Sequence, residues 1–318
     1  MSSRRKPLPP LPPFDEESEF TRVYSSPAGE LTRFGMPPAE MRWKLNLILF
    51  VLTFITTTVW GTIYANESLN LSPWFFLRGL WYSIPLMTIL SAHEMGHFLA
   101  GRRHGLNATL PYFLPGLWPA GTFGAFIRIR SIVTNRRVLM EIGAAGPVAG
   151  AMVSIPFLMV GIALSEVQPS PSPSSVGALS FGSSIVVELI CWLWVGNFSS
   201  SVNLILHPMA VAAWFGLFVT AMNLLPVGQL DGGHVVYALF GPKWAFRASL
   251  ATLLGMGVLG MYWQGWWVFG ILLLILGVRH PPPLDTDTPL DRRSRYLGYA
   301  ALLIFAVTFM PVPLALIN

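Results

Sequence analysis

Long apolar blocks with few charges inside them are the feature that most limits what this chain can fold into. Charged residues make up 11% of the 318 residues and hydrophobic residues 53%, whereas a soluble domain usually carries about 25% charged residues. A helix needs about 20 apolar residues to cross a bilayer. The blocks near that length are Leu45–Tyr64, Leu77–Ala100, Val138–Leu164, His207–Leu225, Phe246–Val278 and Tyr296–Ile317. The sequence therefore predicts an all-α, polytopic membrane protein.

The fifth block is too long for one span and is interrupted by Gln264 and Gly265. We expect two short helices there and about seven spans in all. Five or six spans stay open, because both halves can form one tilted helix.

Two further apolar segments do not fit spans. Leu110–Arg130 contains three prolines and three glycines, so it cannot form one helix. We expect a dip into the membrane that turns back, with Thr122–Ile129 extended. Phe181–Phe198 is compatible with an interfacial helix or a second dip.

Basic residues occur in alternate connections between the blocks. The N-terminal region and residues 101–137, 241–247 and 279–295 carry lysines or arginines, whereas residues 65–76 and 166–206 carry none. The positive-inside rule then predicts a cytoplasmic N-terminus and a C-terminus outside, with only Arg78 on the wrong side.

The N-terminal composition, the net charge and the cysteine content indicate the domain organisation and argue against one class of partner. Residues 1–43 are polar and proline-rich, which predicts a disordered cytoplasmic tail before a transmembrane domain of residues 44–318. The net charge of +5 comes from basic residues in the connections and not from one binding face, which argues against nucleic acid as a partner. The single cysteine, Cys191, excludes an intrachain disulfide.

The pentapeptide HEMGH ends the second block. His93 and His97 are four residues apart, so on a helix they share one face, and two imidazoles at this spacing can hold one Zn²⁺. Glu94 has the place of a general base that takes a proton from the attacking water. The alternative is a polar patch at a helix end, but a charged residue inside a span is costly and usually functional.

A catalytic zinc needs a third protein ligand. The strongest candidate is Asp231, in the stretch NLLPVGQLDGG at the cytoplasmic end of the fourth block. Proline and glycine break the helix there, so its side chain can be directed inward. Alone, Asp231 is also compatible with a turn residue at a helix end.

The two motifs together resemble those of the site-2 protease family, which are intramembrane zinc metalloproteases. The resemblance covers about residues 77–240 and implies one Zn²⁺ per chain, bound by His93, His97 and Asp231. It implies that Glu94 is the catalytic base and that Asn223 holds the substrate or the oxyanion. The stretch GTFGAFIRIR resembles the membrane-dipping β-hairpin of the family, and EIGAAGPVAG resembles its tightly packed glycine-rich span.

This resemblance implies regulated intramembrane proteolysis, in which transmembrane segments of single-span membrane proteins are cleaved. An extended edge formed by Thr122, Phe123, Gly124 and Ala125 is expected to pair with the unwound substrate. The connections are too short for the PDZ domain that many family members carry. The expected location is a bacterial inner membrane.

Other interpretations stay open at this stage. One is a metalloprotease with a glutamate as third ligand, for which the downstream candidates are Glu141, Glu166 and Glu188. Others are a membrane metal transporter and an inactive relative that acts as a binding protein.

Several other residues are compatible with structural roles and need no part in catalysis. His234 is compatible with a supporting role at the metal or with a simple helix start. Glu141 is expected to pair with an arginine, His104 to be a solvated loop residue, and His207 to lie far from the metal. Gly143, Gly146 and Gly150 predict close helix packing.

Overall fold

The computed structural model describes residues 43–65, 73–117, 119–169, 179–196 and 202–316. The predicted tail therefore lies outside the described residues, except for Trp43, which begins the first described helix.

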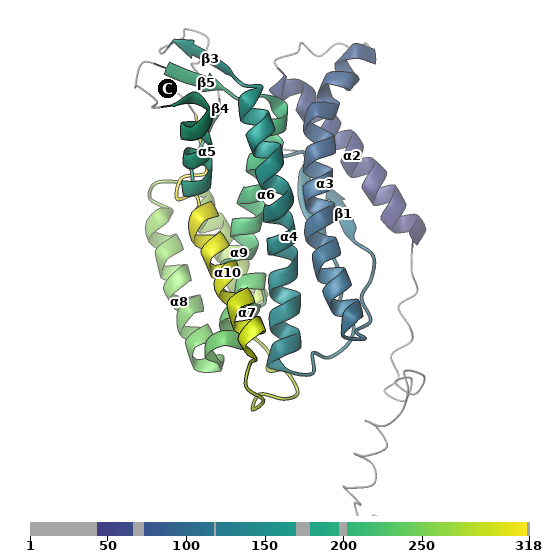
Figure 1. The fold of residues 1–318 in the computed structure, drawn as a ribbon, viewed down its shortest axis with the longest axis vertical. Helices are drawn as coiled ribbons and strands as arrows, with labels where there is room; N and C mark the ends of the chain where they lie inside the picture. Colours follow the sequence, from purple (N-terminus) through teal and green to yellow (C-terminus); the bar gives the residue numbers. More distant parts are fainter. Residues whose placement is uncertain (1–42, 66–72, 118, 170–178, 197–201, 317–318) are drawn as a thin grey trace, which may run out of the picture. The chain divides into compact units, whose positions relative to one another are not determined.

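Helices follow the apolar blocks, and the long fifth block is divided where the sequence predicts (Figure 1). The seven helices that correspond to the blocks are α2 (Trp43–Tyr64), α3 (Pro73–Arg103), α4 (Arg136–Ala163), α6 (Pro208–Asn223), α8 (Pro242–Leu259), α9 (Gly265–Leu276) and α10 (Arg292–Thr308). Two shorter helices are α5 (Ile185–Val195) and α7 (Asp231–Phe240). The segment whose structure the sequence left open, Phe181–Phe198, thus contains a helix.

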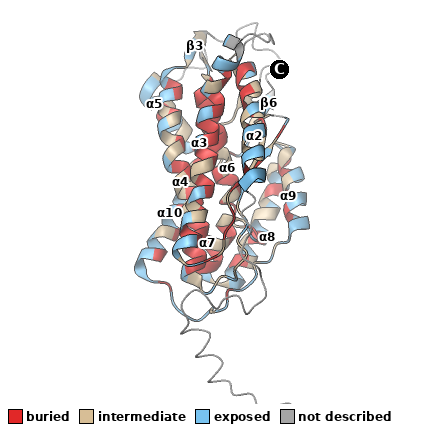
Figure 2. Cartoon of the chain, turned by 90° about the vertical axis from the view of Figure 1, so that its right-hand side faces the viewer, coloured by how far each residue is buried: buried red, intermediate tan, exposed pale blue. Residues whose placement is uncertain are grey.

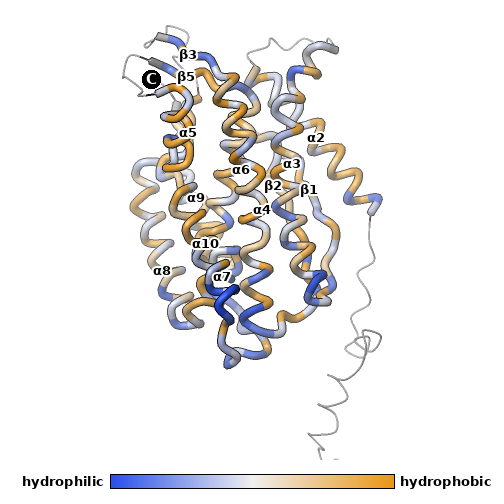
Figure 3. The backbone as a smooth tube through the Cα atoms, in the orientation of Figure 1, coloured by the Kyte–Doolittle hydropathy of each residue, from blue (hydrophilic) through white to orange (hydrophobic). Residues whose placement is uncertain are grey.

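The bundle has two ends that differ in content. One end, called here the α7 end, holds α7, the loop between α3 and α4 and the start of α10; the opposite end, called the β3 end, holds β3 (Glu166–Pro169) and its partner β5 (Val202–Ile205) (Figure 1). Hydrophilic residues gather at the α7 end, while the middle of the bundle is mostly hydrophobic (Figure 3). This distribution is typical of a helical bundle with an apolar belt.

Among the described helices, α2 and α4 are long and apolar enough to cross a membrane by themselves. The structure therefore supports a mostly helical chain with two candidate spans. The larger number of spans stays a prediction.

The last block differs from its prediction. Instead of a helix that reaches Ile317, α10 ends at Thr308. Pro311 and Pro313 follow, and proline cannot continue a helix. The residues beyond them form β6 (Leu314–Leu316), which pairs with β4 (Leu179–Phe181). No pattern in the sequence predicts this pair or the β3–β5 pair.

The proline-rich segment after α3 forms an antiparallel β-hairpin, which confirms that it is not a helix. β1 (Tyr112–Pro115) pairs with β2 (Thr122–Phe126), with Phe113 opposite Ala125. At the turn Gly121 has a φ of 73°, a backbone conformation that favours glycine.

The hairpin is tied to the bundle through its backbone carbonyls. Thr56 of α2 donates a hydrogen bond to the Gly121 carbonyl (2.7 Å), and Tyr82 of α3 donates one to the Ala120 carbonyl (2.9 Å). The Asn46 amide donates to the carbonyl of Pro111 (2.8 Å). These bonds satisfy backbone groups that cannot be left unpaired in an apolar environment. They hold the hairpin in a fixed place beside α3.

The core lies where α3, α4 and α6 meet. Buried residues are frequent along these helices, whereas α8 and α9 keep many residues exposed (Figure 2). Many of the exposed side chains are apolar, among them Leu254, Val268 and Ile275, which are 70% exposed or more. Exposed apolar surface of this extent is typical of a protein surrounded by lipid.

Candidate metal centre

The three predicted ligands lie together at the α7 end of the core. His93 and His97 come from adjacent turns of α3, and Asp231 is the first residue of α7. Oδ2 of Asp231 lies 3.4 Å from Nε2 of His93 and 3.2 Å from Nε2 of His97. One ligand atom from each residue lies within 4.8 Å of the other two. Residues 134 positions apart in the sequence thus form one compact cluster.

A backbone contact fixes how the His97 ring is turned. Its Nδ1 lies 2.8 Å from the carbonyl oxygen of Ile142 on α4. Because a carbonyl can only accept a hydrogen bond, Nδ1 carries a hydrogen, and Nε2 faces Asp231, where it can bind a proton or a metal ion. Ring orientation by a carbonyl of this kind is usual for histidines that bind metals.

Glycines of α4 make room for these rings. A Cβ added at Gly146 would lie 2.0 Å from Nε2 of His97, and one added at Gly150 would lie 3.0 Å from Nδ1 of His93. The close packing that the glycine pattern predicts is therefore confirmed. Here α4 packs directly against the candidate ligands.

The cluster borders a cavity of about 270 Å³. Glu94 lines this cavity and is 5% exposed, beside the two histidines but outside the group of three. Its carboxylate accepts a hydrogen bond from the backbone of Ile127, just beyond β2. Glu94 is thus placed between the candidate ligands and the hairpin.

Asn223, the last residue of α6, also lines the cavity. Its Nδ2 lies 3.1 Å from Nε2 of His93. The amide is therefore within reach of any group held by the three candidate ligands.

The hairpin contributes only part of its predicted edge to the cavity. Ala125 lines it, together with Phe126 and Ile127. The other predicted residues of the edge do not line it: Thr122 bonds the Leu114 carbonyl within the hairpin, and Phe123 is 73% exposed. Gly124 is also absent from the lining. The end of β2 nearest Glu94, and not its beginning, faces the candidate centre.

The three glutamates considered as alternative ligands lie elsewhere. Glu141 pairs with Arg137 (2.9 Å), as predicted, and also with His104 (2.7 Å). The expectation of a solvated His104 is therefore wrong, because the fold brings this loop residue against α4. Glu188 lies on α5 and Glu166 on β3.

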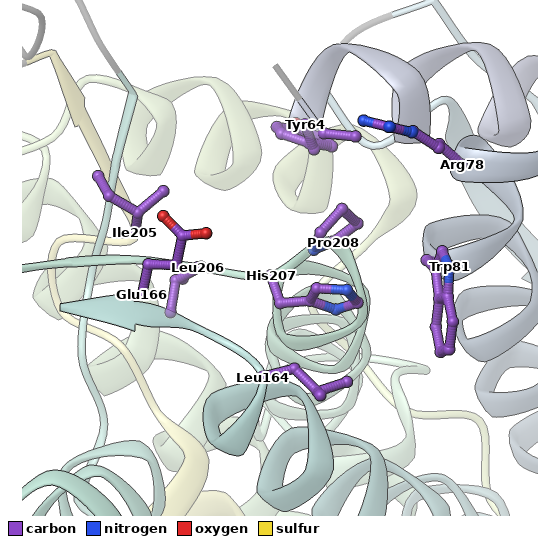
Figure 4. A pocket seen from close by; sticks show the side chains of 10 residues that line it. Tyr64, Arg78, Trp81, Leu164, Glu166, Ile205, Leu206, His207 and Pro208 are labelled. Atoms are coloured by element: carbon purple, nitrogen blue, oxygen red, sulfur yellow. The ribbon is translucent and has the colours of Figure 1, made fainter. Parts of the chain in front are cut away.

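A separate cavity of about 370 Å³ lies at the β3 end, lined by residues that include Arg78, Trp81, Glu166 and His207 (Figure 4). It is larger than the first cavity but contains none of the three candidate ligands. His207 directly precedes α6 there, at the opposite end of this helix from Asn223 and the metal centre, as the sequence predicts.

One further histidine, which no sequence motif indicates, contacts a residue of the centre's cavity. His280, in the loop between α9 and α10, places its Nε2 2.6 Å from Nδ1 of His234 on α7. His234 lines the cavity of the metal centre. His280 stands 46 positions further along the chain, and nothing in its local sequence indicates this contact.

The donor set fits a divalent cation. Two imidazole nitrogens and one carboxylate oxygen are ligands that zinc accepts. None of the described residues that line the cavity is a lysine or an arginine, so only a protonated histidine or a bound cation can balance the Asp231 carboxylate there. A buried carboxylate of this kind requires a compensating positive charge.

Comparisons with known proteins agree with this geometry. The family model described as Peptidase family M50 matches residues 81–256, which contain all three candidate ligands, Glu94 and Asn223. No solved structure matches the chain.

Curated relatives are longer plant proteins. "Probable zinc metalloprotease EGY2, chloroplastic" from Oryza sativa subsp. indica is 33% identical over 74% of this chain and 43% of its own length. "Probable zinc metalloprotease EGY1, chloroplastic" from Arabidopsis thaliana is 35% identical over 71% of this chain and 42% of its own length. The chain thus matches less than half the length of these relatives.

The family model covers more than half of the 318 residues, and its match includes both motifs that form the candidate centre. This chain therefore belongs to peptidase family M50, the site-2 proteases.

Proposed function

We propose that this chain is an intramembrane zinc endopeptidase that cleaves transmembrane segments of single-span membrane proteins. One observation carries the proposal: the buried His93 and His97 converge with Asp231 beside Glu94, in a cavity that the hairpin borders. The relatives' names describe zinc metalloproteases, which supports the same chemistry.

The three converging side chains would hold one Zn²⁺ per chain. Zinc bound there would supply a Lewis acid that polarises the scissile carbonyl and lowers the pKa of water. Glu94 takes a proton from the attacking water and delivers it to the leaving amine. The Asn223 amide, next to His93, donates a hydrogen bond to the carbonyl oxygen as negative charge develops on it.

The edge of β2 would align the substrate. A helical substrate keeps its carbonyls in internal hydrogen bonds and must unwind before attack. Arg128 directs its N–H and C=O toward Thr109, on the β1 side of the hairpin. Because alternate residues of a strand point their polar groups to opposite edges, Ala125 directs its N–H and C=O to the free edge. Ile127 points the same way, and its backbone N–H is the donor to Glu94. Among the described residues only β1 pairs with β2, so this edge can receive an extended peptide.

The seven helices that follow the apolar blocks run in alternating directions (Figure 1). This arrangement supports our proposal of about seven spans. The basic connections gather at the α7 end, which supports a cytoplasmic location for that end and for the N-terminus. The location in a bacterial inner membrane stays a prediction, since the relatives are named as chloroplastic.

A cleavage assay tests the proposal directly. The full chain, purified in detergent with zinc, should cleave a single-span model substrate, and a zinc chelator should stop the reaction. Glu94→Gln should abolish cleavage while metal analysis still finds zinc, because the carboxylate is not among the three ligands. A Glu94→Gln variant that cleaves at the normal rate would remove Glu94 from the reaction.

A further inference from the structure

His234 and His280 form a chain of contacts that reaches from a loop into the cavity. Nδ1 of His234 lies 2.6 Å from Nε2 of His280, and Nδ1 of His280 lies 2.5 Å from the carbonyl oxygen of Pro281. The His280 ring also packs against the Tyr237 ring, with centroids 4.6 Å apart. His280 lies outside the region that matches the family model, residues 81–256.

These contacts determine where the hydrogens lie. The Pro281 carbonyl can only accept, so Nδ1 of His280 carries a hydrogen. Burial lowers the pKa of His280, which favours the neutral ring, and its Nε2 is then an acceptor. The hydrogen shared between the rings must therefore sit on Nδ1 of His234. Nε2 of His234 is left with a lone pair.

This lone pair belongs to a side chain that lines the cavity of the metal centre. No other group among the described residues bonds Nε2 of His234. The side chain fits against α4 only because position 143 is glycine: a Cβ there would lie 2.7 Å from Cβ of His234. His234 is not part of the group of three candidate ligands, so the lone pair is available to another group.

An extended substrate needs such an acceptor. Its peptide groups point to two edges, and the free edge of β2 can pair with one of them only. The polar groups of the other edge must also find partners when water is scarce. The Asn223 amide N–H can serve a carbonyl on that side, and a backbone N–H there requires an acceptor.

We propose that Nε2 of His234 accepts a hydrogen bond from a backbone N–H of the unwound substrate, on the strand edge opposite β2. His280 is the positioning residue that fixes the His234 tautomer required for this bond. The inference rests on the proposed function and adds a residue that recognises the peptide backbone of the substrate.

Two substitutions at position 280 separate this role from packing. His280→Phe keeps a ring against Tyr237 but removes the acceptor, whereas His280→Gln restores an acceptor oxygen near the place of Nε2. In ¹⁵N spectra of histidine-labelled protein, His234 should carry its hydrogen on Nδ1 in the parent and His280→Gln chains. In His280→Phe this preference should be lost.

The second measurement is the affinity for substrate. All chains compared carry Glu94→Gln, so that the peptide is not cleaved. His280→Phe should weaken binding of the single-span model substrate about tenfold, as expected for a lost hydrogen bond in a buried site. His280→Gln should bind nearly as the parent does. Zinc content should be the same in all three.

Ester substrates identify the bond itself. Replacing one backbone amide by an ester removes one N–H, and at one position this should weaken binding to the parent chain about tenfold. The same ester should weaken binding no further in a His234→Leu variant, because this variant has no acceptor at position 234. Such non-additivity is the mark of a direct interaction.

Each result has one meaning. If the parent chain with zinc does not cleave the substrate, the proposed function is wrong. The proposed hydrogen bond from substrate to His234 is then overturned as well. If it cleaves but His280→Phe binds as well as the parent, or no ester shows coupling with His234→Leu, only this inference is overturned. If His280→Phe does not fold, the ester series in the parent chain and in His234→Leu tests the inference alone.

Discussion

Gly146 shows how much a missing side chain matters at the scale of single residues. The position faces Nε2 of His97, and a methyl group there would occupy the space of that ligand atom. The ring cannot swing away without losing its bond from Nδ1 to the Ile142 carbonyl. The geometry of the centre therefore depends on α4 as directly as on the ligands themselves.

We expect Gly146→Ala to lower zinc affinity at least about tenfold, the scale seen when the support of a metal ligand is lost. Zinc titration of the purified chain measures it. Gly255→Ala is the matched control, because Gly255 lies inside α8 with no atom within 4 Å of its added Cβ. Alanine there should leave zinc affinity unchanged and stabilise the helix by about 0.5–1 kcal/mol. Equal zinc affinity in both variants would contradict the role of Gly146.

Asp231→Ala should lower zinc affinity more than about 100-fold, since it removes a ligand and not merely the support of one. Metal analysis after dialysis against a weak chelator provides the measurement. Full zinc occupancy in this variant would exclude Asp231 from the metal centre.

At the scale of elements, the hairpin determines what reaches Glu94. β2 is fixed on one side by β1 and by side chains of α2 and α3, so its free edge is held in place before any substrate arrives. Such preorganisation lowers the cost of ordering a flexible partner.

Ala125→Pro should slow cleavage at least about tenfold with zinc content unchanged, because proline removes an N–H from the free edge. Ala125→Val keeps that N–H and should have a mild effect. Initial rates with the model substrate compare the two. A normal rate for the proline variant would mean that the substrate is aligned elsewhere, with Asn223 and the loop before Asp231 as the next candidates.

The elements differ in how much of them the sequence could predict. The apolar blocks predict the helices because each carries a strong, continuous signal. β4 and β6 are three residues each, and strands this short show no period that sequence reasoning can detect. The proximity of His93, His97 and Asp231 was expected from two motifs with known chemistry. His280 was missed because its contact with His234 exists only after α9 and the following loop have folded back onto α7.

At the scale of the whole described bundle, the alternating direction of the helices gives a topology that can be tested. The loop that contains Thr286 belongs to the basic connections, whereas Ser183 lies in the connection without basic residues. Both residues are exposed.

In a Cys191→Ala background, Thr286→Cys should react with an impermeant thiol reagent only from the cytoplasmic side, and Ser183→Cys only from outside. The expectation follows from the distribution of basic residues. Intact cells and inverted membrane vesicles supply the two accessible sides. Labelling of position 286 from outside would overturn the proposed orientation.

The pairing of β4 with β6 has a consequence for the order in which the protein is assembled. The two strands are separated by more than 130 residues, and the Gly182 backbone N–H also bonds the Pro313 carbonyl. During synthesis the connection between α4 and α6 must therefore wait, without its partner strand, until α10 has been made. Contacts between such distant residues form late and slow the last step of folding. Biogenesis of the β3 end is thus coupled to completion of the chain, while the metal centre can assemble as soon as α7 has emerged.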